Sequence, residues 1–146
     1  RELAEEHLQI TLAISLHASN DEKRKELMPI AKQYAMDELL ETCRYYFKKT
    51  NRRMTFEYSL VAGVNDQPEN AGELCRRLKG FPCHVNLIPV NPIKERNFRQ
   101  SLPESIMEFK KILEKNCINV TIRREMGADI NAACGQLRRT ELQSIK

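Results

Sequence analysis

The chain is 146 residues long, a length that suits one domain with its own packed core. Hydrophobic residues make up 41% of it and charged residues 30%, which is ordinary for a globular protein and excludes collagen-like and low-complexity chains. The 24 basic and 20 acidic side chains give a net charge of +4, and no run approaches the ~20 apolar residues of a membrane span or the pattern of an N-terminal signal segment.

The first third of the chain predicts two helices and a strand after a short helical start over 2–8. The run 10–16 is almost continuously apolar and rich in β-branched residues, which predicts a strand buried on both faces. Residues 21–27 are polar and helix-forming and end before Pro29. Residues 37–50 carry apolar side chains at helical spacing, so an amphipathic helix is expected there.

Strands and helices alternate regularly in the rest of the chain. Three β-rich runs predict strands, over 54–61, 84–89 and 118–122. Helices are predicted from Pro68 to the stop at Gly80, and over 103–116. This order predicts an α/β fold with a mainly parallel sheet and right-handed crossovers.

Polar side chains follow three of the predicted strands. Ser15 and His17 come at the end of the first strand, Asn65 and Asp66 after the second, and Asn91 after the third. Ligands of parallel α/β sheets bind at the carboxyl ends of the strands. We therefore expect these side chains to gather at one edge of the sheet.

The five cysteines are too far apart in sequence for a close metal-ligating pair: Cys43, Cys75, Cys83, Cys117 and Cys134. Their odd number favours a reducing compartment, and we expect a cytoplasmic protein. Cys43, Cys75 and Cys117 fall on or beside apolar helix faces, so we interpret them as packing residues. Cys83 precedes a predicted strand, and the sequence pattern around it indicates no role.

Three segments together resemble one enzyme family: Ala13-Ile-Ser-Leu-His-Ala18, Val85-Asn-Leu-Ile-Pro-Val-Asn-Pro92 and Gly127-Ala-Asp-Ile-Asn-Ala-Ala-Cys-Gly-Gln-Leu137. In this order and spacing the chain resembles the C-terminal part of the dual-specificity RNA methyltransferases of the radical S-adenosylmethionine superfamily. These enzymes act on carbon 2 of an adenosine in 23S rRNA and tRNA. The resemblance runs over essentially all 146 residues.

The resemblance implies a fold, a cofactor site and a carrier residue. Residues 1–146 would form a single incomplete domain, the C-terminal portion of a partial (β/α)6 barrel. Ser15, Leu16, His17 and Asn91 match the family's contacts to S-adenosylmethionine. Cys134 matches the cysteine that is S-methylated, carries the carbon to the RNA, and is finally released as a disulfide with a second cysteine.

The residue types around Cys134 suit that role. Carbon 2 of adenine is electron-poor, so a polar methyl transfer meets no good nucleophile there, whereas a thiolate is a good first acceptor. Small neighbours would let a nucleobase approach the sulfur. Four arginines flank the segment and are candidates for holding RNA phosphates: Arg123, Arg124, Arg138 and Arg139.

Some of the family's parts do not occur in this sequence. A 4Fe–4S cluster needs three closely spaced cysteines, which are expected upstream of residue 1, together with the resolving cysteine and an RNA-binding domain. We therefore expect no metal ligands in this chain, and no activity from it alone. Its expected partners are 23S rRNA and tRNA, the upstream part of the same protein, and an electron donor for the cluster, with no membrane involved.

Two other functions stay open. One is methylation of carbon 8 of the same adenosine by the sister branch of the family, although Leu16 and Pro89 favour carbon 2. The other is a non-catalytic α/β module that docks RNA or a protein through its basic half. The intact Cys134 segment, together with Ser15, His17 and Asn91, argues against that module.

Overall fold

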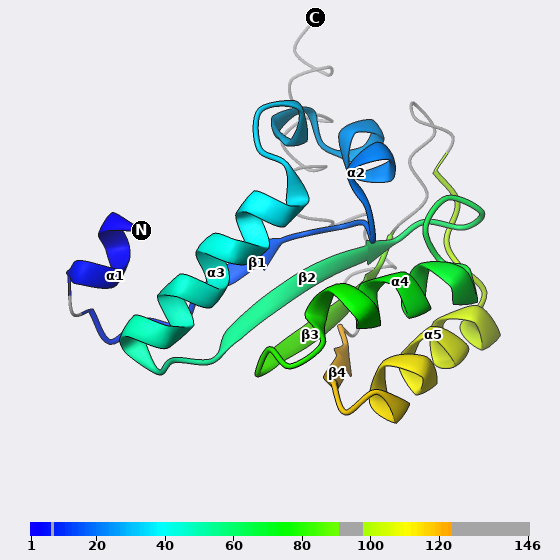
Figure 1. Ribbon diagram of the computed structural model, residues 1–146. Coiled ribbons are helices and arrows are strands. Elements are labelled where there is room, and N and C mark those ends of the chain that lie inside the picture. The colour runs from blue at the N-terminus through cyan, green and yellow to red at the C-terminus, as the bar shows by residue number, and fades with distance from the viewer. Residues whose placement is uncertain (7, 91–97, 124–146) are drawn as a thin grey trace, which may run out of the picture.

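The computed structural model describes residues 1–6, 8–90 and 98–123 (Figure 1). Within them, four parallel strands form one sheet whose strand order is the same as the chain order. The strands are β1 (Ala13–Ser15), β2 (Met54–Leu60), β3 (Cys83–Pro89) and β4 (Asn119–Ile122). The predicted α/β class with a parallel sheet is confirmed.

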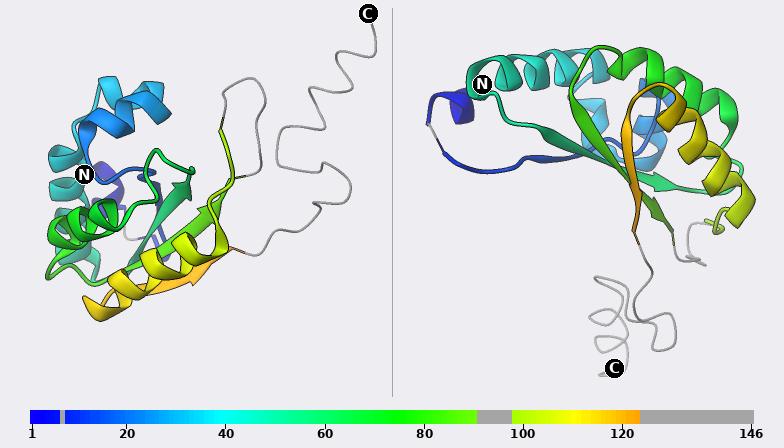
Figure 2. Two further views of the ribbon diagram at one scale, coloured as in Figure 1. Left: turned by 90° about the vertical axis from the view of Figure 1, so that its right-hand side faces the viewer. Right: turned by 90° about the horizontal axis from the view of Figure 1, so that it is seen from below.

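Helices cover one face of this sheet. The α-helices are α1 (Glu2–Glu5), α2 (Asp21–Leu27), α3 (Met36–Thr50), α4 (Pro68–Leu78) and α5 (Pro103–Lys115), and a 3-10 turn, η1 (Pro29–Lys32), follows α2. α3, α4 and α5 all lie on the same side of the strands (Figure 2). In the part of the chain that the structure describes, none of these three helices lies against the opposite face of the sheet, which we call the uncovered face (Figure 2).

The ends of the helices follow from local chemistry. Pro68 occupies the first turn of α4, and Gln67 and Asn70 form a reciprocal capping box around it. α3 ends at Asn51, which adopts a left-handed φ of 53° and donates its N–H to the Phe47 carbonyl at 2.7 Å. Asparagine tolerates this conformation better than most residues. These signals explain why the predicted ends differ from the observed ones by only a residue or so.

The hydrophobic core lies between the sheet and the three long helices. Along β2, alternate side chains are buried against the helices: Met54, Phe56, Tyr58 and Leu60. The intervening side chains, Thr55, Glu57 and Ser59, are half-buried and belong to the uncovered face. The Tyr58 and Phe109 rings pack with centroids 5.1 Å apart, which joins β2 to α5. The predicted strand over 54–61 is thus observed as β2, with one buried and one half-buried face.

The prediction for the first strand is wrong in extent and burial. Only residues 13–15 pair, and only with β2 among the described residues, so β1 is an edge strand. Ala13 is exposed, while Ile14 and Ser15 are half-buried. A continuous apolar run predicts a strand covered on both faces, whereas among the described residues β1 pairs with β2 alone and the long helices lie on only one face of the sheet (Figure 2). The helical start also ends earlier than predicted, at Glu5, and η1 was not predicted.

Cysteine burial agrees with the prediction at two positions and contradicts it at a third. Cys43 and Cys75 are buried in the core, as is Cys83 at the start of β3. Cys117 is exposed and has a positive φ of 59°. The prediction failed because α5 ends at Lys115, so the helical spacing does not continue to Cys117.

Candidate functional site

The carboxyl end of β1 is fixed to β2 by its backbone. The N–H groups of Leu16 and His17 both donate to the Glu57 carbonyl, at 3.0 and 3.1 Å. His17 has a φ of 59°, the left-handed conformation that non-glycine residues rarely adopt. The chain therefore turns sharply here, directly after the strand.

The imidazole of His17 has a defined hydrogen-bonding state. Its Nδ1 accepts the backbone N–H of Ser59 at 3.1 Å, so the proton of the neutral ring is on Nε2. Burial lowers the pKa of His17, the nearby charge of Glu57 raises it, and Arg24 lowers it again. The net direction is downward, which keeps the ring neutral near pH 7 and makes Nε2 a hydrogen-bond donor.

Asn65, which follows β2, joins this turn through its side chain. Its Nδ2 donates to the His17 carbonyl at 2.8 Å and to the Ser59 carbonyl at 2.7 Å. Its Oδ1 accepts the N–H of Val61 at 2.8 Å, and the hydroxyl of Tyr58 donates to its backbone carbonyl at 2.8 Å. Asn65 is completely buried. The predicted gathering of strand-end polar residues is thus confirmed for His17 and Asn65.

The other strand-end residues have different surroundings. Asp66 accepts hydrogen bonds from the Gly63 N–H at 2.9 Å and the Gln67 side chain at 2.7 Å, so it stabilises its own turn. Ser15 pairs in register with Glu57, which places both side chains on the uncovered face. Leu16 is completely buried in the core, so only its backbone can meet a ligand.

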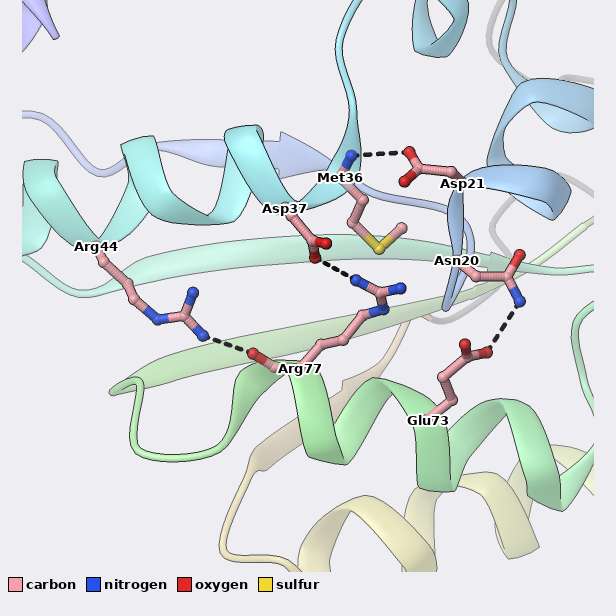
Figure 3. A network of polar contacts seen from close by, with 7 residues as sticks. All are labelled: Asn20, Asp21, Met36, Asp37, Arg44, Glu73 and Arg77. Carbon is pink, nitrogen blue, oxygen red and sulfur yellow. Dashed lines mark hydrogen bonds and ion pairs between the residues drawn. The ribbon is translucent and has the colours of Figure 1, made fainter.

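The loop after His17 is attached to two helices (Figure 3). The Ser19 hydroxyl and the Asn20 Nδ2 donate to the Glu73 carboxylate on α4, at 2.7 and 2.9 Å. Asp21 accepts the N–H of Met36 at the start of α3, at 2.8 Å. The loop that leaves the site is therefore held by side chains distant in sequence.

Sequence reasoning missed several of these residues. Asn20 caps α2 by accepting the Lys23 N–H at 2.9 Å, and the signal for this was an asparagine followed by acidic residues. Arg24 lies in a helix predicted to be polar, yet it is 4% exposed and donates to the Tyr34 carbonyl at 3.0 Å. Nothing in the local pattern distinguished Arg24 from its exposed neighbours.

Part of the predicted site lies outside the described residues, namely Asn91, Arg124, Cys134, Arg138 and Arg139. Arg123 is described: it is exposed directly after β4, and its N–H donates to the Leu87 carbonyl at 2.8 Å. The four cysteines in the described ranges are all free thiols. The predicted disulfide concerns Cys134 and is therefore not among them.

Two general properties of the described ranges bear on function. They contain no group of three or more histidine, cysteine or carboxylate side chains that could hold a metal ion. No helix of the described part is long and apolar enough to cross a membrane.

The fold of the described residues has counterparts among solved structures. A radical SAM methyltransferase from Sphaerobacter thermophilus matches with a TM-score of 0.87 and 49% identity, over 92% of this chain and 40% of that one. A domain of the pyruvate-formate lyase-activating enzyme from Bacteroides vulgatus shares the fold, with a TM-score of 0.67 and 18% identity over 85% of this chain. The chain therefore has the fold of part of a radical SAM methyltransferase.

Curated relatives of this chain are named as RNA methyltransferases. A probable dual-specificity RNA methyltransferase RlmN from Clostridium novyi is 60% identical over 144 residues, which is 99% of this chain and 42% of the relative. The protein of the same name from Lachnoclostridium phytofermentans is 63% identical over 140 residues, 96% of this chain and 39% of the relative. No family model matches. The chain spans about two fifths of the length of these relatives, and over that share the predicted resemblance to dual-specificity RNA methyltransferases is confirmed.

Proposed function

We propose that this chain is part of an RNA methyltransferase that adds a methyl group to carbon 2 of an adenosine in 23S rRNA and tRNA. The observation that carries the proposal is its identity of 60 and 63% to two proteins named as dual-specificity RNA methyltransferases. The 49% identity to a radical SAM methyltransferase of the same fold supports the reaction class. The polar carboxyl end of β1 supports a ligand site at the edge where such sheets bind ligands.

Four residues would hold S-adenosylmethionine: Ser15, Leu16, His17 and Asn91. The described ones fit such a ligand. Ser15 brings a hydroxyl to the uncovered face, Leu16 can contribute only its backbone, and neutral His17 offers the Nε2 donor. The carboxylate of Glu57 on the same face suits a cationic ligand. S-adenosylmethionine supplies the methyl group and the radical chemistry of the reaction when it is bound.

Cys134 would be the residue that receives the transferred carbon. Its thiolate would be methylated to S-methylcysteine by one S-adenosylmethionine, which would leave as S-adenosylhomocysteine, and the carbon would then pass to adenine through a covalent link between protein and RNA. A second cysteine, outside this sequence, releases the product as it forms a disulfide with Cys134. Arg123, Arg124, Arg138 and Arg139 would hold phosphates of the RNA.

The 4Fe–4S cluster and its electron donor complete the proposal. The cluster would be ligated by three cysteines in the preceding part of the same protein, as the family resemblance implies. The chain by itself would then be inactive. We place the enzyme in the cytoplasm, where thiols stay reduced and both RNA substrates occur.

The test uses the complete enzyme with its cluster. Cys134→Ala should abolish methyl transfer while RNA affinity stays unchanged, because only the carbon acceptor is lost. Cys117→Ala is the matched control, since Cys117 is exposed and belongs to no proposed site, and it should retain full activity.

The product decides between the open alternatives. Digestion of the RNA and mass spectrometry should find 2-methyladenosine. Finding 8-methyladenosine would favour the sister branch, and finding neither, with RNA still bound, would favour the non-catalytic module. Undiminished 2-methyladenosine formation by Cys134→Ala would overturn the role of that residue.

A further inference from the structure

We propose that Asn65 is a positioning residue for the cofactor: it holds His17 in the turned conformation that presents its imidazole to S-adenosylmethionine. This inference rests on the proposed function and deepens it. It adds a residue that would touch neither cofactor nor RNA and would act through His17.

The backbone of His17 needs such support. A non-glycine residue with a φ of 59° is destabilised, and it persists only where its surroundings over-determine it. Three atoms of His17 are tied to β2 or to the turn after it. Its N–H donates to the Glu57 backbone carbonyl, its Nδ1 accepts the Ser59 backbone N–H, and its carbonyl accepts from the Asn65 side-chain amide.

Of the three groups that hydrogen-bond to His17, only the amide of Asn65 belongs to a side chain. The other two are backbone groups of β2, which any strand would offer at that register. The amide of Asn65 instead bridges the His17 and Ser59 carbonyls with its two N–H donors, while its oxygen accepts from Val61. An asparagine fits this set of two acceptors and one donor, whereas an aspartate of the same shape would oppose two carbonyls with a carboxylate.

The position of Asn65 is itself fixed from the core. The buried hydroxyl of Tyr58 donates to its carbonyl at 2.8 Å, and Tyr58 packs against Phe109 of α5. A continuous chain of contacts therefore leads from the core through Asn65 to His17. This rigidity is what a residue must have if it is to set the direction of another side chain.

The first measurement is equilibrium binding of S-adenosylmethionine to the complete, cluster-loaded protein by calorimetry, without a reductant. Asn65→Asp should weaken this binding about 10-fold, because two buried hydrogen bonds at the turn are lost. RNA affinity should stay within about 2-fold, since the turn carries none of the proposed phosphate contacts.

Asn70→Asp is the matched control. Asn70 is also a buried amide, 6% exposed, in the same region, but its Oδ1 accepts from the Gln67 N–H at 3.2 Å and from Lys23 at 3.5 Å. Aspartate preserves both acceptor roles, and these two hydrogen bonds join Asn70 to Lys23 and Gln67 rather than to His17. Its S-adenosylmethionine affinity should stay within about 2-fold of the wild type.

A double-mutant cycle separates positioning from general stabilisation. His17→Gly removes the imidazole and adopts the positive φ without strain. If Asn65 acts through His17, adding Asn65→Asp to that background should weaken binding by less than about 2-fold. Full additivity of the two changes would overturn the inference.

A second variant covers the case in which Asn65→Asp does not fold. Tyr58→Phe removes a single hydroxyl, retains the ring packing, and should weaken S-adenosylmethionine binding about 3-fold. The inference is wrong if a folded Asn65→Asp variant, or Tyr58→Phe in its place, binds the cofactor like the wild type. It is also wrong if cofactor and RNA affinity fall together. Failure of the wild type to bind S-adenosylmethionine would instead contradict the proposed function.

Discussion

The hydroxyl of Ser19 donates to the carboxylate of Glu73 over 2.7 Å, although 54 residues separate them in the chain. Ser19 is completely buried, and Asn20 donates to the same carboxylate oxygen at 2.9 Å. Because His17 lies two residues before Ser19, Glu73 fixes the loop through which the chain leaves the candidate site.

Removal of the Glu73 carboxylate should destabilise the protein. In Glu73→Ala, the buried Ser19 hydroxyl and the Asn20 amide lose their acceptor, so we expect the free energy of unfolding to fall by ~1–3 kcal/mol. Urea denaturation measures the change. Glu108→Ala, at an exposed position on α5, should change the same quantity by no more than ~0.5 kcal/mol. Equal effects of the two substitutions would show that the Glu73 hydrogen bonds contribute nothing.

The packing of Phe109 against Tyr58 should be a main source of stability. Phe109 is 1% exposed, and Phe109→Ala leaves a cavity between α5 and β2, so the free energy of unfolding should fall by ~3–5 kcal/mol. Met107, two residues earlier on the same helix, is 45% exposed, and Met107→Ala should cost ~0.5 kcal/mol or less. If Phe109→Ala lowered the free energy of unfolding no more than Met107→Ala does, the packing of α5 against β2 would be contradicted.

The neutral state of His17 should make this region sensitive to acid. Its pKa is lowered in the folded protein, chiefly by burial, so the stability it contributes is complete above its unfolded pKa of about 6.5 and is lost as the pH falls through the folded pKa. NMR titration of the His17 ring should give a pKa below that of a free histidine, with the proton on Nε2.

Two substitutions test the charges that face His17. Glu57→Gln removes a charge that raises its pKa and should lower that pKa further, whereas Arg24→Gln should raise it. The same NMR titration reads both shifts. A His17 pKa above the free value would contradict the buried, neutral ring that accepts the Ser59 N–H. Shifts of the opposite sign would contradict the placement of Glu57 and Arg24 near the ring.

Thiol reactivity should follow burial among the described cysteines. Burial raises the pKa of Cys43 and of Cys83 to about 11, and Cys75 is buried too, whereas Cys117 is exposed. Only a thiolate reacts, so a disulfide reagent at pH 8 should label Cys117 far faster than Cys43 or Cys83. Peptide mass spectrometry can follow each site, with Cys117→Ser as the control that loses the label. If Cys43 were labelled faster than Cys117 in the native protein, the burial of Cys43 in the core would be contradicted.

Local pattern was sufficient wherever an element is decided by its own residues. The β-rich run over 54–61 predicted β2, and Pro68 and Gly80 marked α4 within a residue or two. The same reasoning failed for β1 and Cys117. Burial of β1 depended on what lies beside it in the sheet, and burial of Cys117 depended on where α5 stops.

The amino-acid sequence by itself determined the alternation of strands and helices and the motifs that resemble the methyltransferase family, because periodicity and residue type are local properties. Only the tertiary structure decided that the Asn65 amide reaches the carbonyl of His17, 48 residues away, and that Arg24 is buried. These contacts arise when distant segments pack around one core, and no local pattern encodes which of them will meet.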